Sequence, residues 1–319
     1  MKSHPAFEAL IDKFRRKEIH SAHSGRELMH ALHLLVVESP ASCWSEMQAE
    51  LDLALDKLLS QMLAYAPPIN VLHSFLAIVS HVRTEGGSLI ELKSAVSDLA
   101  NGYQVWSDEA RAEIAEIAIQ LIGEGSTIFT FTLSETVMTT LSHVWESGKH
   151  FRVHVTESRP NNDGLLTAER LAALGVTVEV SIDACIPDLM RDAGLMIGGA
   201  EAIMMDGSAV CKTGTHLAAL AAREFGVPFY ILADTMKFDV SSMHGFQAKF
   251  DQISREDFPD LSGESEIQIA GHLFDRTPAR LIRSVVTERG VIPATACVEI
   301  MRHMPVSEAL LARLRSIED

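Results

Sequence analysis

Beyond Gly125, short apolar segments alternate with segments long enough to form a helix, and this alternation restricts the fold more than any other feature of the chain. The short segments are rich in β-branched and aromatic residues, as buried strands are. They read STIFTFT, FRVHVTES, VTVEVSI, GLMIGG and VPFYILAD. Strands separated by helices form parallel sheets, because each connection must cross back over the sheet. We therefore predict an α/β fold whose C-terminal domain, residues 124–319, is a Rossmann-like parallel sheet.

The first part of the chain has the apolar spacing of helices. Apolar residues recur three or four apart in ELMHALHLLVVES, WSEMQAELDLALDKLLSQMLAYA, INVLHSFLAIVSHV and SDEARAEIAEIAIQLI. Pro67 and Pro68 separate the second of these helices from the third, since proline interrupts a helix interior. Ser107 is followed by two acidic residues, a pattern typical of a helix N-terminus. The sequence predicts an all-helical N-terminal domain over residues 1–123.

Charge and cysteine positions exclude several classes of function. The chain has 27 basic and 43 acidic residues and a formal net charge of −16, which disfavours binding to nucleic acid and to anionic membranes. No apolar run reaches the roughly 20 residues that span a bilayer. The four cysteines lack metal-binding spacing, and no acidic or thiol partner accompanies His20, His23, His30 and His33. We expect a cytoplasmic protein with reduced cysteines, no metal and no cofactor.

In open α/β sheets a ligand lies at the carboxyl ends of the strands. The residues at those ends are Thr132 to Ser134, Glu157 to Arg159, Asp183, Gly198 to Glu201, and Asp234 to Lys237. After the fourth of these segments comes a polar loop with Asp206 and Lys212, and then an alanine-rich helix. Backbone amides and the positive end of a helix attract anions. The sequence therefore predicts an anionic ligand held by Lys212 and the adjacent helix end.

Three longer segments resemble successive signatures of one protein family. They begin at residues 156, 199 and 273 and read TESRPNNDGLLTAERLAALGVTVEV, GAEAIMMDGSAVCKTGTHLAALAAREFGVPFYILADTMKFD and LFDRTPARLIRSVVTERGVI. The family unites the regulatory subunits of eukaryotic translation initiation factor 2B with sugar-phosphate isomerases that act on methylthioribose 1-phosphate and ribose 1,5-bisphosphate. The resemblance covers residues 126–295 well and the helical half weakly. It implies a helical domain, a Rossmann-like domain and a homodimer.

The chain departs from the isomerases of this family at several positions. Thr132 stands where the resemblance implies a catalytic cysteine, and Glu201 stands where it implies an aspartate in a glycine-alanine-aspartate turn. A hydroxyl is a weaker acid and nucleophile than a thiol, and an added methylene displaces the reacting carboxylate. The family's arginine-glycine-alanine turn, arginine-proline pair and loop asparagine are also replaced. Here they read His20-Ser21-Ala22, Pro67-Pro68 and Cys211.

The resemblance also implies which residues bind the ligand. Arg159 presents a planar fork to phosphate oxygens, and Lys212 supplies a point charge. The predicted ligand-binding set is Arg159, Lys212, Gly199, Ala200, Cys211 and His20, and the predicted catalytic set, if the chain turns a substrate over, is Glu201 and Thr132. Structural alternatives remain open for several of them. Glu201 caps its turn or pairs with Lys212, Thr132 bonds its strand-end neighbours, and Cys211 is a small buried thiol.

Three functions are compatible with these residues. The first is a regulatory protein that binds a phosphorylated sugar or nucleotide, as the regulatory alpha subunit is thought to do. The second is an aldose-ketose isomerase with a rebuilt site, in which Glu201 is the base and Asp206 or a helix residue is the acid. The third is a protein interaction module with a vestigial pocket. The apolar segments VPFYILADTMKF and FDVSSMHGFQ predict that the α/β half forms the homodimer.

Overall fold

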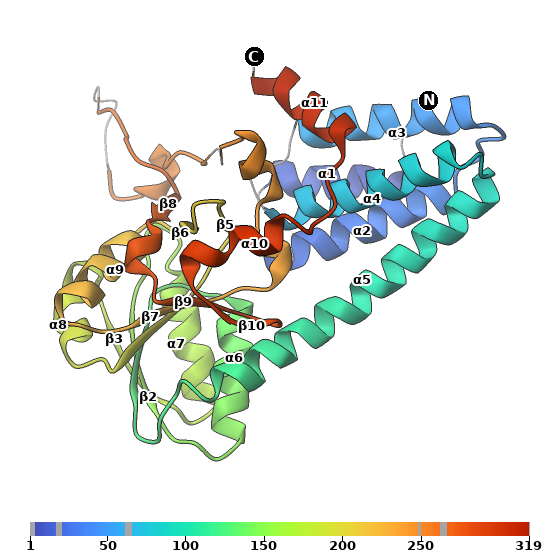
Figure 1. Cartoon of the computed structure of the whole chain (residues 1–319). Helices are drawn as coiled ribbons and strands as arrows, with labels where there is room; N and C mark the ends of the chain where they lie inside the picture. Colours follow the sequence, from blue (N-terminus) through green and yellow to red (C-terminus); the bar gives the residue numbers. More distant parts are fainter. Residues whose placement is uncertain (1–3, 17–20, 61–65, 248–249, 262–266, 319) are drawn as a thin grey trace. The chain divides into compact units, whose positions relative to one another are not determined.

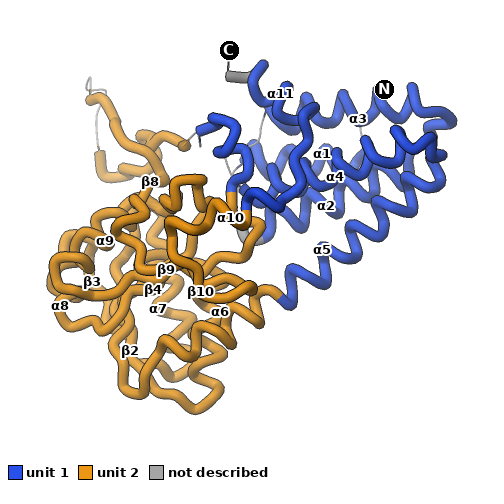
Figure 2. The backbone as a smooth tube through the Cα atoms, in the orientation of Figure 1, with its two compact units in different colours: residues 1–109, 239–248, 301–319 blue, residues 110–238, 249–300 orange. Residues whose placement is uncertain are grey.

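The computed structural model describes the whole chain except residues 1–3, 17–20, 61–65, 248–249, 262–266 and 319. The chain forms two compact units, coloured separately in Figure 2. Unit 1 comprises residues 1–109, 239–248 and 301–319, and unit 2 comprises residues 110–238 and 249–300. Both units are made of several separate segments of the chain. The predicted domains 1–123 and 124–319 are single segments, and this two-domain division remains a prediction.

Unit 1 is built from helices, as its apolar spacing predicts (Figure 1). Its helices are α1 (Pro5–Arg15), α2 (Ser21–Val37), α3 (Trp44–Leu59), α4 (Ala66–Thr84), the first part of α5 (Leu89–Ala118) and α11 (Glu308–Glu318). Pro67 and Pro68 lie in the first turn of α4, where a missing N–H costs no helical hydrogen bond. Large side chains such as Phe7, Leu28 and Phe75 are fully buried in this unit.

The predicted helix start at Ser107 is wrong. Helix α5 runs without interruption from Leu89 to Ala118, so Ser107 lies in its interior and its hydroxyl accepts from Arg26 Nη2 at 3.1 Å. The real start carries a reciprocal capping box: the Ser88 amide donates to Glu91 Oε2 at 2.6 Å, and the Glu91 amide donates to Ser88 Oγ at 3.3 Å. Residue types that favour caps also occur inside helices, so their presence alone did not locate the boundary.

Unit 2 contains the predicted parallel sheet. Among the described residues it has the strand order β10-β9-β7-β4-β1-β2-β3, and every pairing is parallel except that of β10 with β9. Its strands are β1 (Thr127–Thr130), β2 (Arg152–Thr156), β3 (Thr177–Ser181), β4 (Leu195–Gly199), β7 (Phe229–Leu232), β9 (Ser284–Thr287) and β10 (Gly290–Ile292). The apolar segments identified β1, β2, β3, β4 and β7, whereas β9 and β10 were not predicted.

Helices α6 (Glu135–Glu146), α7 (Asp163–Ala173) and α8 (Ile186–Arg191) pack on this sheet. Unit 2 also contains α9 (Thr215–Glu224) and most of α10 (Val298–Met301), of which Met301 belongs to unit 1. Helix α7 contacts β2 and β3, and α6 contacts β4. Ile128, Val153 and Ile197, from three strands of the sheet, are fully buried in one apolar cluster with Leu141 of α6 and Leu171 of α7. No helix among the described residues is long and apolar enough to cross a membrane.

The prediction of a polar loop before α9 is wrong, because most of this segment forms strands of a second sheet. Strands β5 (Ala202–Ile203), β6 (Ala209–Lys212) and β8 (Phe274–Thr277) pair antiparallel in the order β5-β6-β8. The β5–β6 turn requires Gly207, whose φ is +77° and whose added Cβ would lie 2.1 Å from the Ala294 carbonyl oxygen. These strands are too short to show an alternating pattern in the sequence.

Candidate functional site

The direction of the chain across the sheet reverses between β1 and β4, which places a switch point between the carboxyl ends of these two strands. The segments that follow the strands meet there. A Cβ added at Gly199, the last residue of β4, would lie 2.3 Å from Ser134 Oγ, so only glycine allows this approach. Ser134 caps α6 two residues after Thr132, which is half-buried. Thr132 and the Gly199-Ala200-Glu201 turn therefore lie in segments that touch.

Glu201 pairs with a lysine from the neighbouring strand. Its Oε2 lies 3.7 Å from Nζ of Lys237, which sits in the short turn that follows β7. The Lys237 side chain is 7% exposed. The predicted pairing of Glu201 with Lys212 is thus wrong. Glu201 Oε2 is buried and accepts no hydrogen bond, and a buried carboxylate oxygen normally has a donor.

Lys212 lies at the end of β6 and pairs with the first residue of α7. Its Nζ is 3.1 Å from Asp163 Oδ2 and 5.7 Å from the centre of the Phe274 ring. The exposed fractions of the Lys212 and Asp163 side chains are 12% and 20%. Asp163 comes four residues after Arg159. The contact therefore brings Lys212 beside the loop that carries Arg159, the other cation predicted to bind the ligand.

Arg159 is exposed and follows β2. Its backbone amide donates to Asp183 Oδ2 at 2.8 Å, and its Nη2 donates to the carbonyl of Asp257 at 3.0 Å. One hydrogen bond to a main-chain oxygen leaves most of the guanidinium donors available to a ligand. The position of Arg159 at a strand end agrees with the prediction, whereas its role in binding is untested.

The start of helix α9 already holds a carboxylate. Asp275 Oδ2 accepts from the amides of Gly214 and His216 at 2.8 and 3.0 Å, and burial raises the pKa of Asp275. Asp275 of β8 thus occupies two of the donors at this helix end, and the predicted anion contact, which would need the other donors, stays a prediction. Strand β8 comes some sixty residues later in the chain, which is why local sequence gave no sign of it.

Of three further predicted site residues, two bond to neighbouring protein groups and the third lies outside the described residues. Cys211 is buried, its Sγ donates to the Gly199 carbonyl at 3.4 Å, and burial raises its pKa, as the buried-thiol alternative predicts. Asp206, the predicted acid, bonds Ser208 Oγ and pairs with Arg276. His20 lies outside the described residues.

Sequence reasoning missed a group of charges beside Lys237. Glu288, in the turn after β9, accepts from the Thr235 amide at 3.1 Å, and Asp234 Oδ1 accepts from the Met236 amide at the same distance. Burial raises the pKa of both carboxyl groups. Asp234 and Lys237 were among the strand-end residues, but nothing local indicated that Glu288 would join them.

Buried hydroxyls without partners lie at the same strand ends. Thr130 is the last residue of β1, Thr156 is the last residue of β2, and Ser158 comes two residues after Thr156. The hydroxyl oxygens of these three residues have no hydrogen-bond partner. Each of these residues is at most 1% exposed. Unpaired buried polar atoms are uncommon in folded proteins. Their occurrence at adjacent strand ends marks this edge of the sheet as a candidate binding site.

Comparisons with known proteins agree with this fold. A sequence model of the Initiation factor 2 subunit family matches residues 18–294. The ribose 1,5-bisphosphate isomerase of Thermococcus kodakarensis is 29% identical over 301 residues, 92% of each chain. A putative translation initiation factor eIF-2B subunit 2-like protein of Pyrococcus horikoshii is 37% identical over 185 residues, 58% of this chain and 64% of that protein.

The structural comparison covers nearly the whole chain. The crystal structure of translation initiation factor eIF-2B from Pyrococcus horikoshii OT3 has a TM-score of 0.75 and 25% identity, over 91% of this chain and 98% of that one. The family model spans well over half of the sequence, including the strand ends described above. The chain therefore belongs to the Initiation factor 2 subunit family.

Proposed function

We propose that this protein binds a phosphorylated sugar at the carboxyl edge of the unit 2 sheet. The observation that carries the proposal is a pair of lysine–carboxylate contacts on either side of the switch point, Lys237 with Glu201 and Lys212 with Asp163. In the first contact, Lys237 follows β7 and Glu201 follows β4. In the second, Asp163 begins the helix that follows β2. Strands β7 and β2 are three positions apart, or about 14 Å at a usual strand spacing. This span suits a ligand with an anionic group at each end.

The carboxylates favour a sugar phosphate over inorganic phosphate alone. A phosphate bound by Lys212 or Lys237 has Asp163 or Glu201 beside it, and a carboxylate repels phosphate unless a hydroxyl donor intervenes. Sugar hydroxyls are such donors, and one of them would supply the hydrogen bond that Glu201 Oε2 lacks. Nucleotides carry the same ribose and phosphate groups, so they belong in the test as competitors.

Turnover is the second candidate function, favoured by the similarity to the ribose 1,5-bisphosphate isomerase. In such a reaction Glu201 would take the proton from C2 of a ring-opened aldose and return it to C1, and Lys237 would stabilise the charge that develops on oxygen. A threonine hydroxyl needs an adjacent base to act as a nucleophile, and among the described residues none is hydrogen-bonded to the Thr132 hydroxyl. We therefore place binding first and catalysis second.

Calorimetry with matched arginine variants tests the proposal. Ribose 1,5-bisphosphate, methylthioribose 1-phosphate, AMP and inorganic phosphate are titrated into the protein. Arg152 is the first residue of β2, Arg159 follows the other end of this strand by three residues, and both are exposed. We expect Arg159→Ala and Lys212→Ala to weaken sugar-phosphate binding about 10- to 100-fold, because charge-assisted contacts to phosphate are strong. Arg152→Ala should bind like the wild type.

The remaining outcomes separate the alternatives. Equal affinity of wild type, Arg159→Ala and Lys212→Ala would place the binding site elsewhere. No binding of any ligand would favour the interaction module. We expect no conversion of ribose 1,5-bisphosphate or methylthioribose 1-phosphate to its ketose at a family-like rate, and turnover abolished by Glu201→Ala would establish the isomerase instead.

A further inference from the structure

The loop between β2 and α7 has a backbone that its sequence does not favour. Ser158 has a φ of +60°, although it is not glycine, and so does Asn162 at the start of α7. The left-handed region is unfavourable for residues with a Cβ and persists only where the surroundings hold it. The Ser158 side chain is fully buried, and its Oγ has no hydrogen-bond partner. Its own hydroxyl therefore does not hold this conformation.

Asp183 holds the loop from the neighbouring strand. It is the first residue of the short helical turn Asp183–Cys185 that follows β3. Its Oδ1 accepts from the Ser158 amide at 2.9 Å, and its Oδ2 accepts from the Arg159 amide at 2.8 Å. Both oxygens of one carboxylate thus bond consecutive amides, and such charge-assisted bonds are stronger than neutral ones.

The other described hydrogen bonds of the loop do not involve the backbone amide of Arg159. The Glu157 amide donates to the Ser181 carbonyl at 2.9 Å, and the Asn162 amide donates to the Ser158 carbonyl at 3.0 Å. The Arg159 side chain has its single described hydrogen bond to the Asp257 carbonyl. The backbone direction from which the guanidinium extends is therefore set at the amides of Ser158 and Arg159.

We infer that Asp183 is a positioning residue for Arg159, which it orients for an anionic ligand by holding the amides of Ser158 and Arg159. The inference rests on the proposed function. Asp183 does not contact the ligand in this scheme, since its two oxygens face backbone amides. Its effect on binding must therefore pass through Arg159, and this requirement distinguishes positioning from general stabilisation of the fold.

A double-mutant cycle measures this dependence. Calorimetry with ribose 1,5-bisphosphate is carried out on wild type, Asp183→Ala, Arg159→Ala and the double variant. We expect Asp183→Ala to weaken binding about 10-fold, and the double variant to bind no more weakly than Arg159→Ala, because the carboxylate has nothing left to orient. Asp188→Ala is the matched control, since Asp188 lies five residues later, is 74% exposed and approaches Arg191 only at 3.9 Å.

A second, milder variant keeps the inference testable if Asp183→Ala does not fold. Asp183→Asn keeps the shape of the side chain but replaces one acceptor oxygen by a donor, so it should lose one of the two amide bonds and show a smaller loss of affinity. Deuterium exchange of the amides of Ser158 and Arg159 should accelerate in both variants. Unchanged affinity of Asp183→Ala, or a loss that persists in full in the Arg159→Ala background, would overturn the inference alone. Absence of binding by the wild type would reject the proposed function and, with it, this inference.

Discussion

Lys237 carries a charge that has little contact with water. Its side chain is 7% exposed, and its Nζ lies 3.7 Å from the Glu201 carboxylate. Removal of one partner of a buried ion pair weakens the compensation of the other charge, and this costs more than the pair contributes. The Glu201 side chain is 27% exposed, so water offsets part of that cost.

We therefore predict that Glu201→Gln lowers the free energy of unfolding by about 1 kcal/mol, and that Glu201→Gln with Lys237→Met recovers part of the loss. Urea unfolding at neutral pH measures both. Glu179→Gln is the control, because the Glu179 side chain is 68% exposed where it approaches His154. A double variant less stable than the sum of the single variants would show that the two residues do not compensate each other.

His73 makes the stability of unit 1 depend on pH. It is fully buried in α4, its Nδ1 accepts from the Ser307 amide at 3.0 Å, and its Nε2 lies 3.2 Å from Ser241 Oγ. Burial, with a smaller effect of the nearby His244, lowers the pKa of His73 from 6.5 to about 4. Between these values the unfolded chain binds a proton that the folded chain does not, so stability falls as the pH drops from 6.5 towards 4.

We predict that this histidine contributes up to about 3 kcal/mol to the loss of stability on acidification. Urea unfolding at neutral and at mildly acidic pH should show a smaller loss for His73→Gln than for wild type, although His73→Gln is less stable at neutral pH. His81→Gln is the control, since His81 lies on the exposed side of the same helix. An equal pH dependence in His73→Gln and wild type would contradict the prediction.

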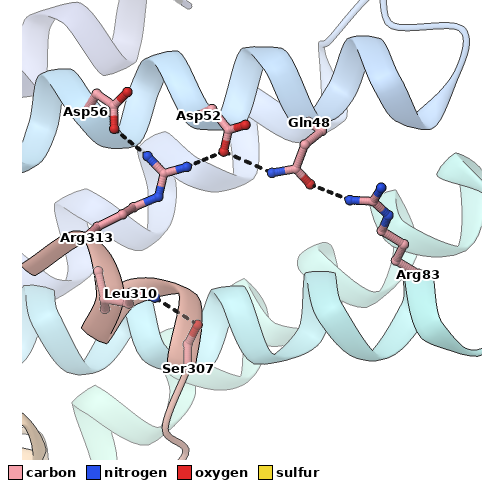
Figure 3. A network of polar contacts seen from close by, with 7 residues as sticks. All are labelled: Gln48, Asp52, Asp56, Arg83, Ser307, Leu310 and Arg313. Carbon is pink, nitrogen blue, oxygen red and sulfur yellow. Dashed lines mark hydrogen bonds and ion pairs between the residues drawn. The ribbon is translucent and has the colours of Figure 1, made fainter.

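At the scale of secondary-structure elements, one arginine joins α11 to α3. Arg313 donates from Nη1 to Asp56 and from Nη2 to Asp52, and Figure 3 shows the guanidinium between the two carboxylates. Asp52 in turn accepts from Gln48 Nε2, whose amide oxygen accepts from Arg83 of α4, each at 2.9 Å. A fork-shaped group between two acids on one helix fixes the orientation of α11 better than a single ion pair.

We predict that Arg313→Ala lowers the free energy of unfolding by about 1 kcal/mol and that Arg313→Lys recovers less than half of it, because lysine lacks the fork. Urea unfolding, with deuterium exchange of residues 308–316, measures both effects. Arg315→Ala on the exposed side of α11 should behave like wild type. Equal stability of Arg313→Ala and Arg315→Ala would mean that apolar packing alone holds the helix.

For the whole molecule, the homodimer remains a prediction, but two of the aromatic residues that suggested its interface are buried within the chain. Phe229 and Phe238, which make the predicted interface segment apolar, are 1% and 0% exposed and lie in the interior of unit 2. They therefore cannot face a second chain. Exposed apolar side chains occur instead on α9, where Leu217 and Leu220 are 54% and 44% exposed.

We predict that light scattering at micromolar concentration reports twice the 34.9 kDa of one chain. Burial of exposed apolar side chains such as Leu217 and Leu220 would stabilise that association. Leu217→Asp should then shift the mass towards the monomer, whereas Leu165→Asp on α7, where Leu165 is 39% exposed, serves as the control. A monomeric mass for the wild-type protein would contradict the prediction.

Local sequence was sufficient for features that depend on neighbours along the chain. Apolar segments such as 151–158 and 194–199 identified strands, because a buried strand needs apolar side chains throughout, and the lengths between them indicated parallel pairing. The strand-end rule then brought Glu201, Arg159 and Lys237 to one edge of the sheet. The same local reasoning placed a helix start at Ser107, inside α5, because capping residue types also occur in helix interiors.

Only the tertiary structure decided which charges meet. Glu201 pairs with Lys237 because β4 and β7 are adjacent in the sheet, and Lys212 pairs with Asp163 because β6 belongs to a separate antiparallel sheet. Asp275 reaches the start of α9 across a long stretch of sequence and takes two of the donors that a helix end would offer to an anion. The sequence by itself determined where five of the strands lie along the chain and which residue types stand at their ends. Their partners followed from strand order and register, which are set by packing between distant segments and leave no periodic signal in any one of them.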